Sequence, residues 1–151
     1  MNSDLRIEDI LASEGMYVST TVGVSMYPML CNRRDTIVVR PLKEGERLRK
    51  FDIPLYRRGE KYILHRIIKV LPDGYNILGD NCVQIERNIP DNAIIGVLSE
   101  YWRGEKKKSL NSFGYKLYVR VWYLMMPIRL VYKKTRAFCG KVYRKLFKKS
   151  K

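Results

Sequence analysis

A serine at a bend is the first residue of this chain whose setting suggests chemistry. Ser25 comes two residues after Gly23, which interrupts an extended β-branched stretch, and Pro28 then stops the strand from continuing. Such a bend can expose a hydroxyl and direct backbone N–H groups toward one point, as a nucleophile beside an oxyanion site requires. A serine in a turn more often only hydrogen-bonds the turn. Ser25 is therefore a candidate nucleophile whose role depends on its partners.

One histidine and two carboxylates are the candidate partners. His65 is the only histidine and stands in a long apolar run, where such a residue is more often structural than catalytic. As a general base for Ser25 it would need a carboxylate to orient its second ring nitrogen. Asp80 lies in a turn and Glu86 lies beside Arg87, and both are candidates for that carboxylate. The residues alone do not choose between them.

The elements that must position these residues are mostly strands. A short helix should begin at Ser3 or Asp4, run to about Glu14 and end at Gly15. Pro54 indicates that its strand lies at a sheet edge. Stretches rich in β-branched and aromatic residues predict strands at about 16–22, 36–40, 53–57, 61–71, 75–78 and 93–102. This spacing is typical of a mainly β fold, either a compact antiparallel barrel or a sandwich.

Four blocks of the sequence, taken together, resemble the signal peptidase I and LexA-type serine peptidases. In chain order the blocks are Gly23–Leu30, Asp35–Val39, His65–Ile68 and Gly79–Asn81. The resemblance covers about residues 16–104 and implies a β domain in which Ser25 attacks a peptide carbonyl. Most bacterial members use a lysine base in the third block. His65 at that place is similar to the branch that contains the endoplasmic-reticulum and archaeal signal peptidases.

The resemblance also implies roles for neighbouring residues. Glu86, where the family has an aspartate, would hold the imidazole, while Asp80 would shape its loop or, as the alternative, take the same role. Gly23, Met26 and Pro28 would contact the substrate, which is expected to be a peptide, a leader or a precursor protein. The backbone N–H of the nucleophile would bind the oxyanion. Gly23 stands where some members place an additional hydroxyl donor.

Charge divides the chain into two parts. The 151 residues carry a formal net charge of +15, yet residues 1–105 hold 15 basic and 15 acidic side chains, and residues 106–151 hold 15 basic and no acidic ones. Three cysteines without a CxxC pair and a single histidine predict no disulfide framework, no metal site and no cofactor. The N-terminus does not resemble a signal peptide, and the longest uncharged stretch of the cationic part, Val121–Ile128, is too short to span a bilayer. We therefore expect a cytoplasmic protein.

The sequence predicts three segments, namely an N-terminal helix at 1–15, a catalytic domain at 16–104 and a basic tail at 105–151. From about Ser112 the apolar residues recur at helical spacing, and Pro127 should divide this part into two helices. A helix with one apolar and one cationic face can lie on an anionic membrane, so we expect peripheral association with the inner face of the membrane. The apolar face of the last helix is formed by Phe138, Cys139, Val142, Tyr143, Leu146 and Phe147.

Two alternatives to a serine endopeptidase stay open. A nucleic-acid-binding protein would use the cationic segment to bind phosphates and its aromatic residues to stack on bases. The nucleic-acid-binding alternative is disfavoured by comparison with LexA-type proteins. In those proteins a DNA-binding module of several dozen residues precedes the catalytic part, whereas only about 15 residues precede it in this sequence. A catalytically silent module on the same scaffold is disfavoured because Ser, His and a carboxylate are all present at matching positions.

Overall fold

The computed structural model describes residues 6–147 and divides the chain into two compact units. The first unit, called the body here, extends to Leu110, and the second, called the helical unit, begins at Asn111. The expected helix caps Ser3 and Asp4 lie outside the described residues, and the prediction that the helix begins there is wrong, because Arg6 is extended and the helix begins at Ile7.

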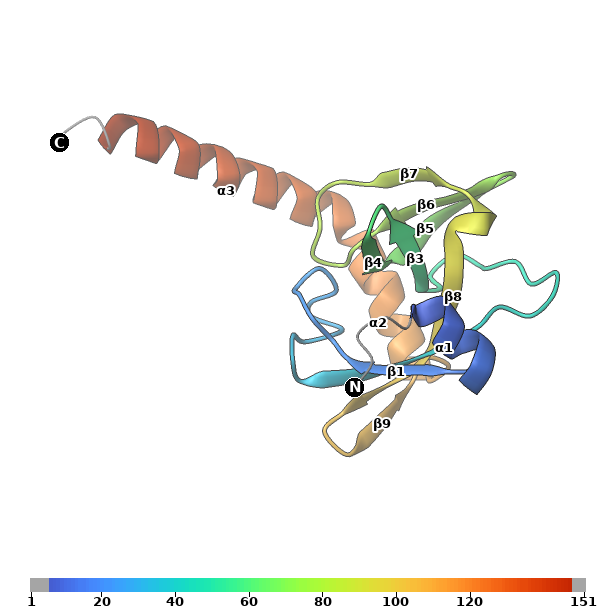
Figure 1. Ribbon diagram of the computed structural model, residues 1–151. Coiled ribbons are helices and arrows are strands. Elements are labelled where there is room, and N and C mark those ends of the chain that lie inside the picture. The colour runs from blue at the N-terminus through green and yellow to red at the C-terminus, as the bar shows by residue number, and fades with distance from the viewer. Residues whose placement is uncertain (1–5, 148–151) are drawn as a thin grey trace. The chain divides into compact units, whose positions relative to one another are not determined.

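The body is mainly β and antiparallel, as predicted (Figure 1). Its described residues form nine strands in two sheets, one of which is curled into a half-barrel. The larger sheet has the strand order β1-β2-β8-β3-β4, with β9 paired to β8, and the smaller sheet has the order β5-β6-β7. The strands are β1 (Tyr17–Thr20), β2 (Asp35–Arg40), β3 (Pro54–Arg58), β4 (Lys61–Leu64), β5 (Arg66–Leu71), β6 (Gly74–Leu78), β7 (Glu86–Ile89), β8 (Ile94–Arg103) and β9 (Lys106–Ser109).

Two short helical elements complete the body. Helix α1 (Ile7–Glu14) follows Arg6 and ends at Gly15, whose φ of 69° is the left-handed conformation that closes a helix. The Gly15 N–H donates to the carbonyl of Leu11, the buried residue of α1. A single 3-10 turn, η1 (Asp91–Ala93), precedes β8.

The predicted strand at 61–71 is in fact two strands that belong to different sheets. β4 pairs with β3, β5 pairs with β6, and His65 stands between them where the chain passes from one sheet to the other. The apolar run continues across this point, so its pattern does not reveal the change of sheet. The prediction of an edge strand at Pro54 is wrong, because β3 lies between β8 and β4. Pro54 is tolerated there because it is the first residue of its strand.

The core joins the two sheets. Tyr56 from β3 and Ile67 from β5 are fully buried in one cluster with Tyr75 and Ile77 from β6. Burial of several large apolar side chains between the sheets fixes their relative position. The junction at His65 is therefore held by packed residues on both sides.

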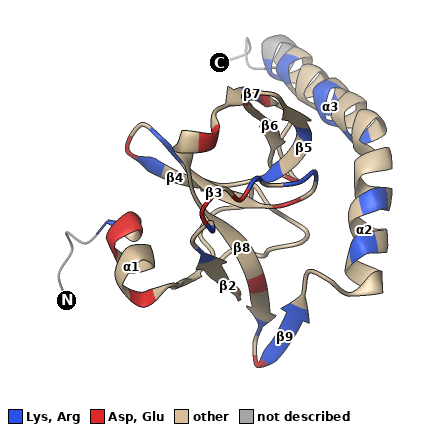
Figure 2. Ribbon diagram, turned by 90° about the vertical axis from the view of Figure 1, so that its right-hand side faces the viewer, with Lys and Arg blue, Asp and Glu red and all other residues tan. Residues whose placement is uncertain are grey.

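The helical unit contains α2 (Phe113–Leu124) and α3 (Met126–Phe147). The Ser112 hydroxyl accepts a hydrogen bond from the Tyr115 N–H at 3.2 Å and caps α2. Met125 separates the two helices, and α3 begins one residue before Pro127, close to the predicted break. Figure 2 shows Lys and Arg along both helices, whereas the acidic residues lie on elements of the body. Within residues 6–147, no helix combines the length and the apolar character needed to cross a bilayer.

Candidate active site

Ser25 lies in the loop between β1 and β2, and this loop is closed at its base. The Thr21 N–H donates to the Asp35 carbonyl at 2.9 Å, and the Thr21 hydroxyl donates to the Cys31 carbonyl at 2.7 Å. Asp35 is fully buried, and its carboxylate accepts a hydrogen bond from the Cys31 N–H at 2.9 Å and an ion pair from Arg34 at 2.7 Å. These bonds hold the two ends of the loop together and so restrict the position of the half-buried Ser25.

A second loop, between β6 and β7, contacts the backbone around the serine. The Asn81 N–H donates to the Ser25 carbonyl at 2.7 Å, and the Asn81 side-chain amide donates to the Val24 carbonyl at 3.1 Å. A Cβ atom placed on Gly79 would lie 2.8 Å from the Ser25 carbonyl oxygen and 2.9 Å from His65 Nε2. Glycine is thus the residue that allows this approach. The Ser25 carbonyl and His65 Nε2 therefore both lie close to Gly79.

Glu86 is the carboxylate that contacts the histidine. Its Oε1 atom lies 3.0 Å from His65 Nδ1, on the side of the ring away from Nε2. Both residues are largely buried, since their side chains are 9% and 13% exposed. Glu86 is the first residue of β7, and His65 stands between β4 and β5, so the smaller sheet positions the pair.

Two residues that the sequence analysis did not single out complete this arrangement. The Tyr56 hydroxyl donates to Glu86 Oε1 at 2.7 Å, and Arg58 pairs with Glu86 Oε2 at 2.9 Å. Tyr56 also packs edge-on against the His65 ring, with 6.3 Å between ring centroids. The two residues alternate on β3, so they project from the same face of the strand. That alternation was the only signal in the sequence, and it does not identify their partner.

Asp80 has a different place. Its carboxylate forms a two-pronged ion pair with Arg66, with Arg66 Nε 2.8 Å from one oxygen and a terminal nitrogen 2.7 Å from the other. Both side chains are almost completely buried. Arg66 also donates to the Phe51 carbonyl at 3.2 Å. Of the two candidates for orienting His65, Glu86 is in contact with the ring, and Asp80 ties its loop to the start of β5.

We expect Asp80→Asn to destabilise the body strongly. The substitution leaves the buried guanidinium of Arg66 without its counter-charge, and breaking a buried ion pair in this way costs about 3–5 kcal/mol. Urea denaturation monitored by circular dichroism measures the change in the free energy of unfolding. Asp73→Asn, at an exposed turn, is the matched control and should change it little. A loss below about 1 kcal/mol for Asp80→Asn would contradict this structural role.

Burial and charge set the protonation of the pair. Burial lowers the pKa of His65, and Arg58 acts in the same direction, while Glu86 and then Asp80 oppose it. The net result is a pKa below the ordinary value of 6.5, so the imidazole is neutral at pH 7. Burial opposes ionisation of Glu86, but the Tyr56 hydroxyl, Arg58 and His65 together outweigh it and lower the pKa of that carboxyl. At neutral pH the site therefore holds a carboxylate beside a neutral imidazole.

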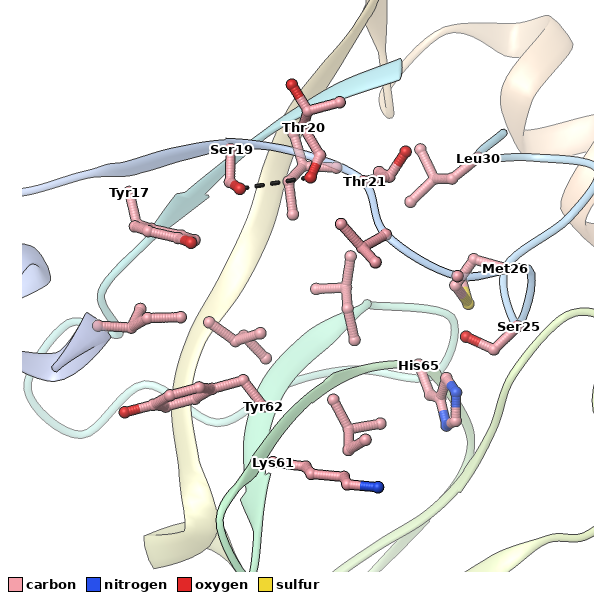
Figure 3. Close-up of a pocket in the computed structure, with 17 residues that line it drawn as sticks. Tyr17, Ser19, Thr20, Thr21, Ser25, Met26, Leu30, Lys61, Tyr62 and His65 are labelled. Atoms are coloured by element: carbon pink, nitrogen blue, oxygen red, sulfur yellow. Dashed lines mark hydrogen bonds between the residues drawn. The ribbon is translucent and has the colours of Figure 1, made fainter. Parts of the chain in front are cut away.

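A cavity of about 500 Å³ opens beside the serine (Figure 3). Ser25 and His65 lie at one end of the cavity, and β1 and β4 supply much of its wall. Of the predicted substrate contacts, Gly23 and Met26 line it, whereas Pro28 is not among its lining residues. Most lining side chains are apolar or aromatic. The further lining residues are Ile7, Tyr17, Ser19, Thr20, Thr21, Val22, Leu30, Ile37, Leu55, Lys61, Tyr62, Ile63 and Leu64.

The serine hydroxyl itself is available in this arrangement. Within residues 6–147 no hydrogen bond joins the Ser25 hydroxyl to His65, although the two residues lie together in Figure 3. Catalytic hydrogen bonds often form at full strength only when substrate is bound. The same described range contains no group of three or more His, Cys, Asp or Glu residues arranged to hold a metal ion.

Comparison of this chain with models of known protein families found no match, and neither did comparisons with curated proteins and with solved structures.

Proposed function

We propose that this chain is a serine endopeptidase of the signal-peptidase-like type that cleaves a peptide or precursor protein. One observation carries the proposal. The buried Glu86 carboxylate contacts Nδ1 of His65, while Nε2 of the same ring faces the loop that holds Ser25. Acyl transfer to a serine requires this spatial order, in which a carboxylate orients a base and the base faces a nucleophile.

The hydrogen bonds around Glu86 fix the tautomer of the base. An ionised carboxylate only accepts hydrogen bonds, so Glu86 Oε1 accepts from both the Tyr56 hydroxyl and His65 Nδ1. The proton of the neutral imidazole is thereby held on Nδ1. Nε2 then carries a lone pair on the side of Ser25, as a general base for its hydroxyl must.

The reaction follows from these positions. Ser25 Oγ attacks the peptide carbonyl carbon while its proton passes to His65 Nε2, and Glu86 stabilises the imidazolium that forms. The oxyanion can be bound by the backbone N–H of Ser25, which makes no hydrogen bond within the described part of the chain. The C–N bond then breaks as His65 returns the proton to the leaving amine. Water hydrolyses the resulting ester with the same base, and Ser25 is regenerated.

The cavity favours an extended peptide as the substrate. β1 and β4 are the two end strands of the larger sheet, and both contribute to the wall beside Ser25. An extended segment can pair with such strands through backbone hydrogen bonds and place alternate side chains into a pocket. Because the lining is mostly apolar, we expect small or medium apolar side chains next to the cleaved bond.

The proposal is tested with a library of peptides derived from a whole proteome. Purified protein is incubated with the library at neutral pH, and new N-termini are identified by mass spectrometry. We expect new termini that share an apolar preference on the side of the cleaved bond that enters the cavity. Folded protein that produces no new termini would overturn the proposal.

We expect Arg58→Met to move the acid limb of the kcat/KM profile to higher pH. The base must be neutral, so activity is lost as pH falls through the His65 pKa, which lies below 6.5. Arg58 lowers that pKa, and its removal raises it, while Glu86 and Tyr56 keep their contacts with the ring and Asp80 keeps its ion pair with Arg66. The measurement uses a peptide cleaved in the library. Arg57→Met, whose guanidinium pairs with Glu60, is the control and should leave the limb unchanged. A limb that stays in place or moves to lower pH in Arg58→Met would contradict this role.

A further inference from the structure

A row of exposed apolar side chains, interrupted once, follows the helical unit from Leu117 to Val142. Its members are spaced alternately four and three residues apart, which keeps them on one face of a helix. Thr135 fills the one position of this spacing that is not apolar. The apolar stripe consists of Leu117, Val121, Leu124, Ile128, Val131, Phe138 and Val142.

The stripe is exposed to an unusual degree. Leu124 is 75% exposed, Ile128 63% and Phe138 67%, and all seven members are exposed. Val119, which points away from the stripe, is buried at 3%. A row of exposed apolar side chains like this one is typical of a site that binds a membrane or another protein.

The stripe has members on both α2 and α3, and the junction between the two helices is braced. The Arg129 guanidinium lies 3.6 Å from the centroid of the Trp122 ring and donates to the Trp122 carbonyl at 2.7 Å. A cation held over an aromatic ring in this way is an attractive contact. Leu124 and Ile128, one on each side of this braced junction, are both exposed.

Cations border the stripe on both sides, and acidic residues are absent from this part of the sequence. Lys134 and Arg136 each lie about a quarter turn from Thr135, on opposite sides of it. Lys116 and Lys141 border the stripe in the same way, beside Leu117 and Val142. Residues 106–151 contain no Asp or Glu, so nothing in the sequence of this unit neutralises them.

We infer that the apolar stripe is a docking surface for an anionic lipid bilayer. On a membrane surface the apolar row enters the boundary of the acyl chains, while the bordering Lys and Arg side chains reach the negative headgroups. Tyr132 and Tyr143, which are exposed beside the row, suit the headgroup level. This inference is independent of the proposed peptidase activity.

Charge and shape distinguish a bilayer from the other possible partners. A second copy of this chain would bring like charges together along the whole row, which is unfavourable. Nucleic acid would satisfy the cations but would leave the apolar stripe in water. A groove in an acidic protein would have to match the stripe along two successive helices, from Leu117 to Val142, whereas a bilayer accommodates any length.

Vesicle flotation tests the inference with the full chain carrying Ser25→Ala, so that peptidase activity plays no part. We expect at least tenfold stronger binding to vesicles with about 30 mol% phosphatidylglycerol than to neutral phosphatidylcholine vesicles, and weaker binding as salt increases. Combined Leu124→Gln, Ile128→Gln and Val131→Gln substitutions should weaken the binding at least tenfold, because they remove apolar contact without changing charge. Ala137→Gln, exposed on the opposite face, is the control and should bind as the parent protein does.

Four results would overturn the inference. One is equal vesicle binding by the triple variant and its parent, which would make the attraction purely electrostatic. Another is absence of binding to anionic vesicles. The third is retention of DNA across a salt series in which vesicles are not bound. The fourth is a stable dimer, measured by sedimentation equilibrium, that is lost in the triple variant while the parent does not bind vesicles.

Discussion

Ser25→Ala should abolish peptide cleavage and leave the fold unchanged. The substitution removes the oxygen that forms the acyl bond, and in enzymes of this kind loss of the nucleophile reduces kcat by about 10⁴-fold or more. The side chain is half-buried and makes no hydrogen bond within the described residues, so its removal leaves no buried group unsatisfied. We therefore expect an unchanged thermal unfolding midpoint with cleavage below detection. Initial rates on a library-derived peptide and a circular dichroism melt measure the two quantities.

Ser19→Ala provides a matched control for this prediction. Ser19 also lines the cavity, but it lies on β1 and its hydroxyl donates only to the neighbouring Thr20 carbonyl. Cleavage by Ser19→Ala should stay close to that of the parent protein. Cleavage retained by Ser25→Ala would show that another group is the nucleophile. If neither the parent nor the variants cleave any peptide, the body is a catalytically silent scaffold.

The sequence suggested candidate members of the site but did not reveal how the elements bring them together. Ser25, His65 and Glu86 could be proposed together because the blocks around them resemble a peptidase family, and the structure brings Glu86 into contact with His65. The sequence could not choose between Asp80 and Glu86. The choice depends on Arg66, which is buried beside Asp80 and pairs with it, and a buried arginine cannot be recognised from an apolar strand pattern.

Tyr56 and Arg58 could not be predicted as parts of the site. Tyr56 is 30 residues from Glu86, and the two meet only because the core packs the smaller sheet against β3. Such long-range contacts depend on tertiary packing and leave no local pattern. The mainly β fold was predicted because it rests on local spacing of strands and turns. The break at His65 was missed because the apolar run continues through it, although the residues before it pair in one sheet and those after it in the other.

Glu86→Gln should reduce kcat by about 10⁴-fold with little change in KM. An amide has both a donor and an acceptor end, so it no longer requires His65 Nδ1 to carry the proton. The imidazole can then place its proton on Nε2, where it cannot accept the proton of Ser25. Replacement of the orienting carboxylate by an amide in a serine triad has an effect of this size because it stabilises the wrong tautomer.

The pH profile distinguishes this role from a structural one. Glu86 raises the pKa of His65 through its charge and its hydrogen bond, so Glu86→Gln should lower that pKa further below 6.5. Residual activity should then lose its acid limb at a lower pH than in the parent protein, which is the opposite of the shift expected for Arg58→Met. Glu60→Gln, at an exposed residue paired with Arg57, is the control for loss of one carboxylate and should change neither kcat nor the profile. Less than a tenfold loss of kcat in Glu86→Gln, or an acid limb at higher pH, would show that Glu86 does not orient the base.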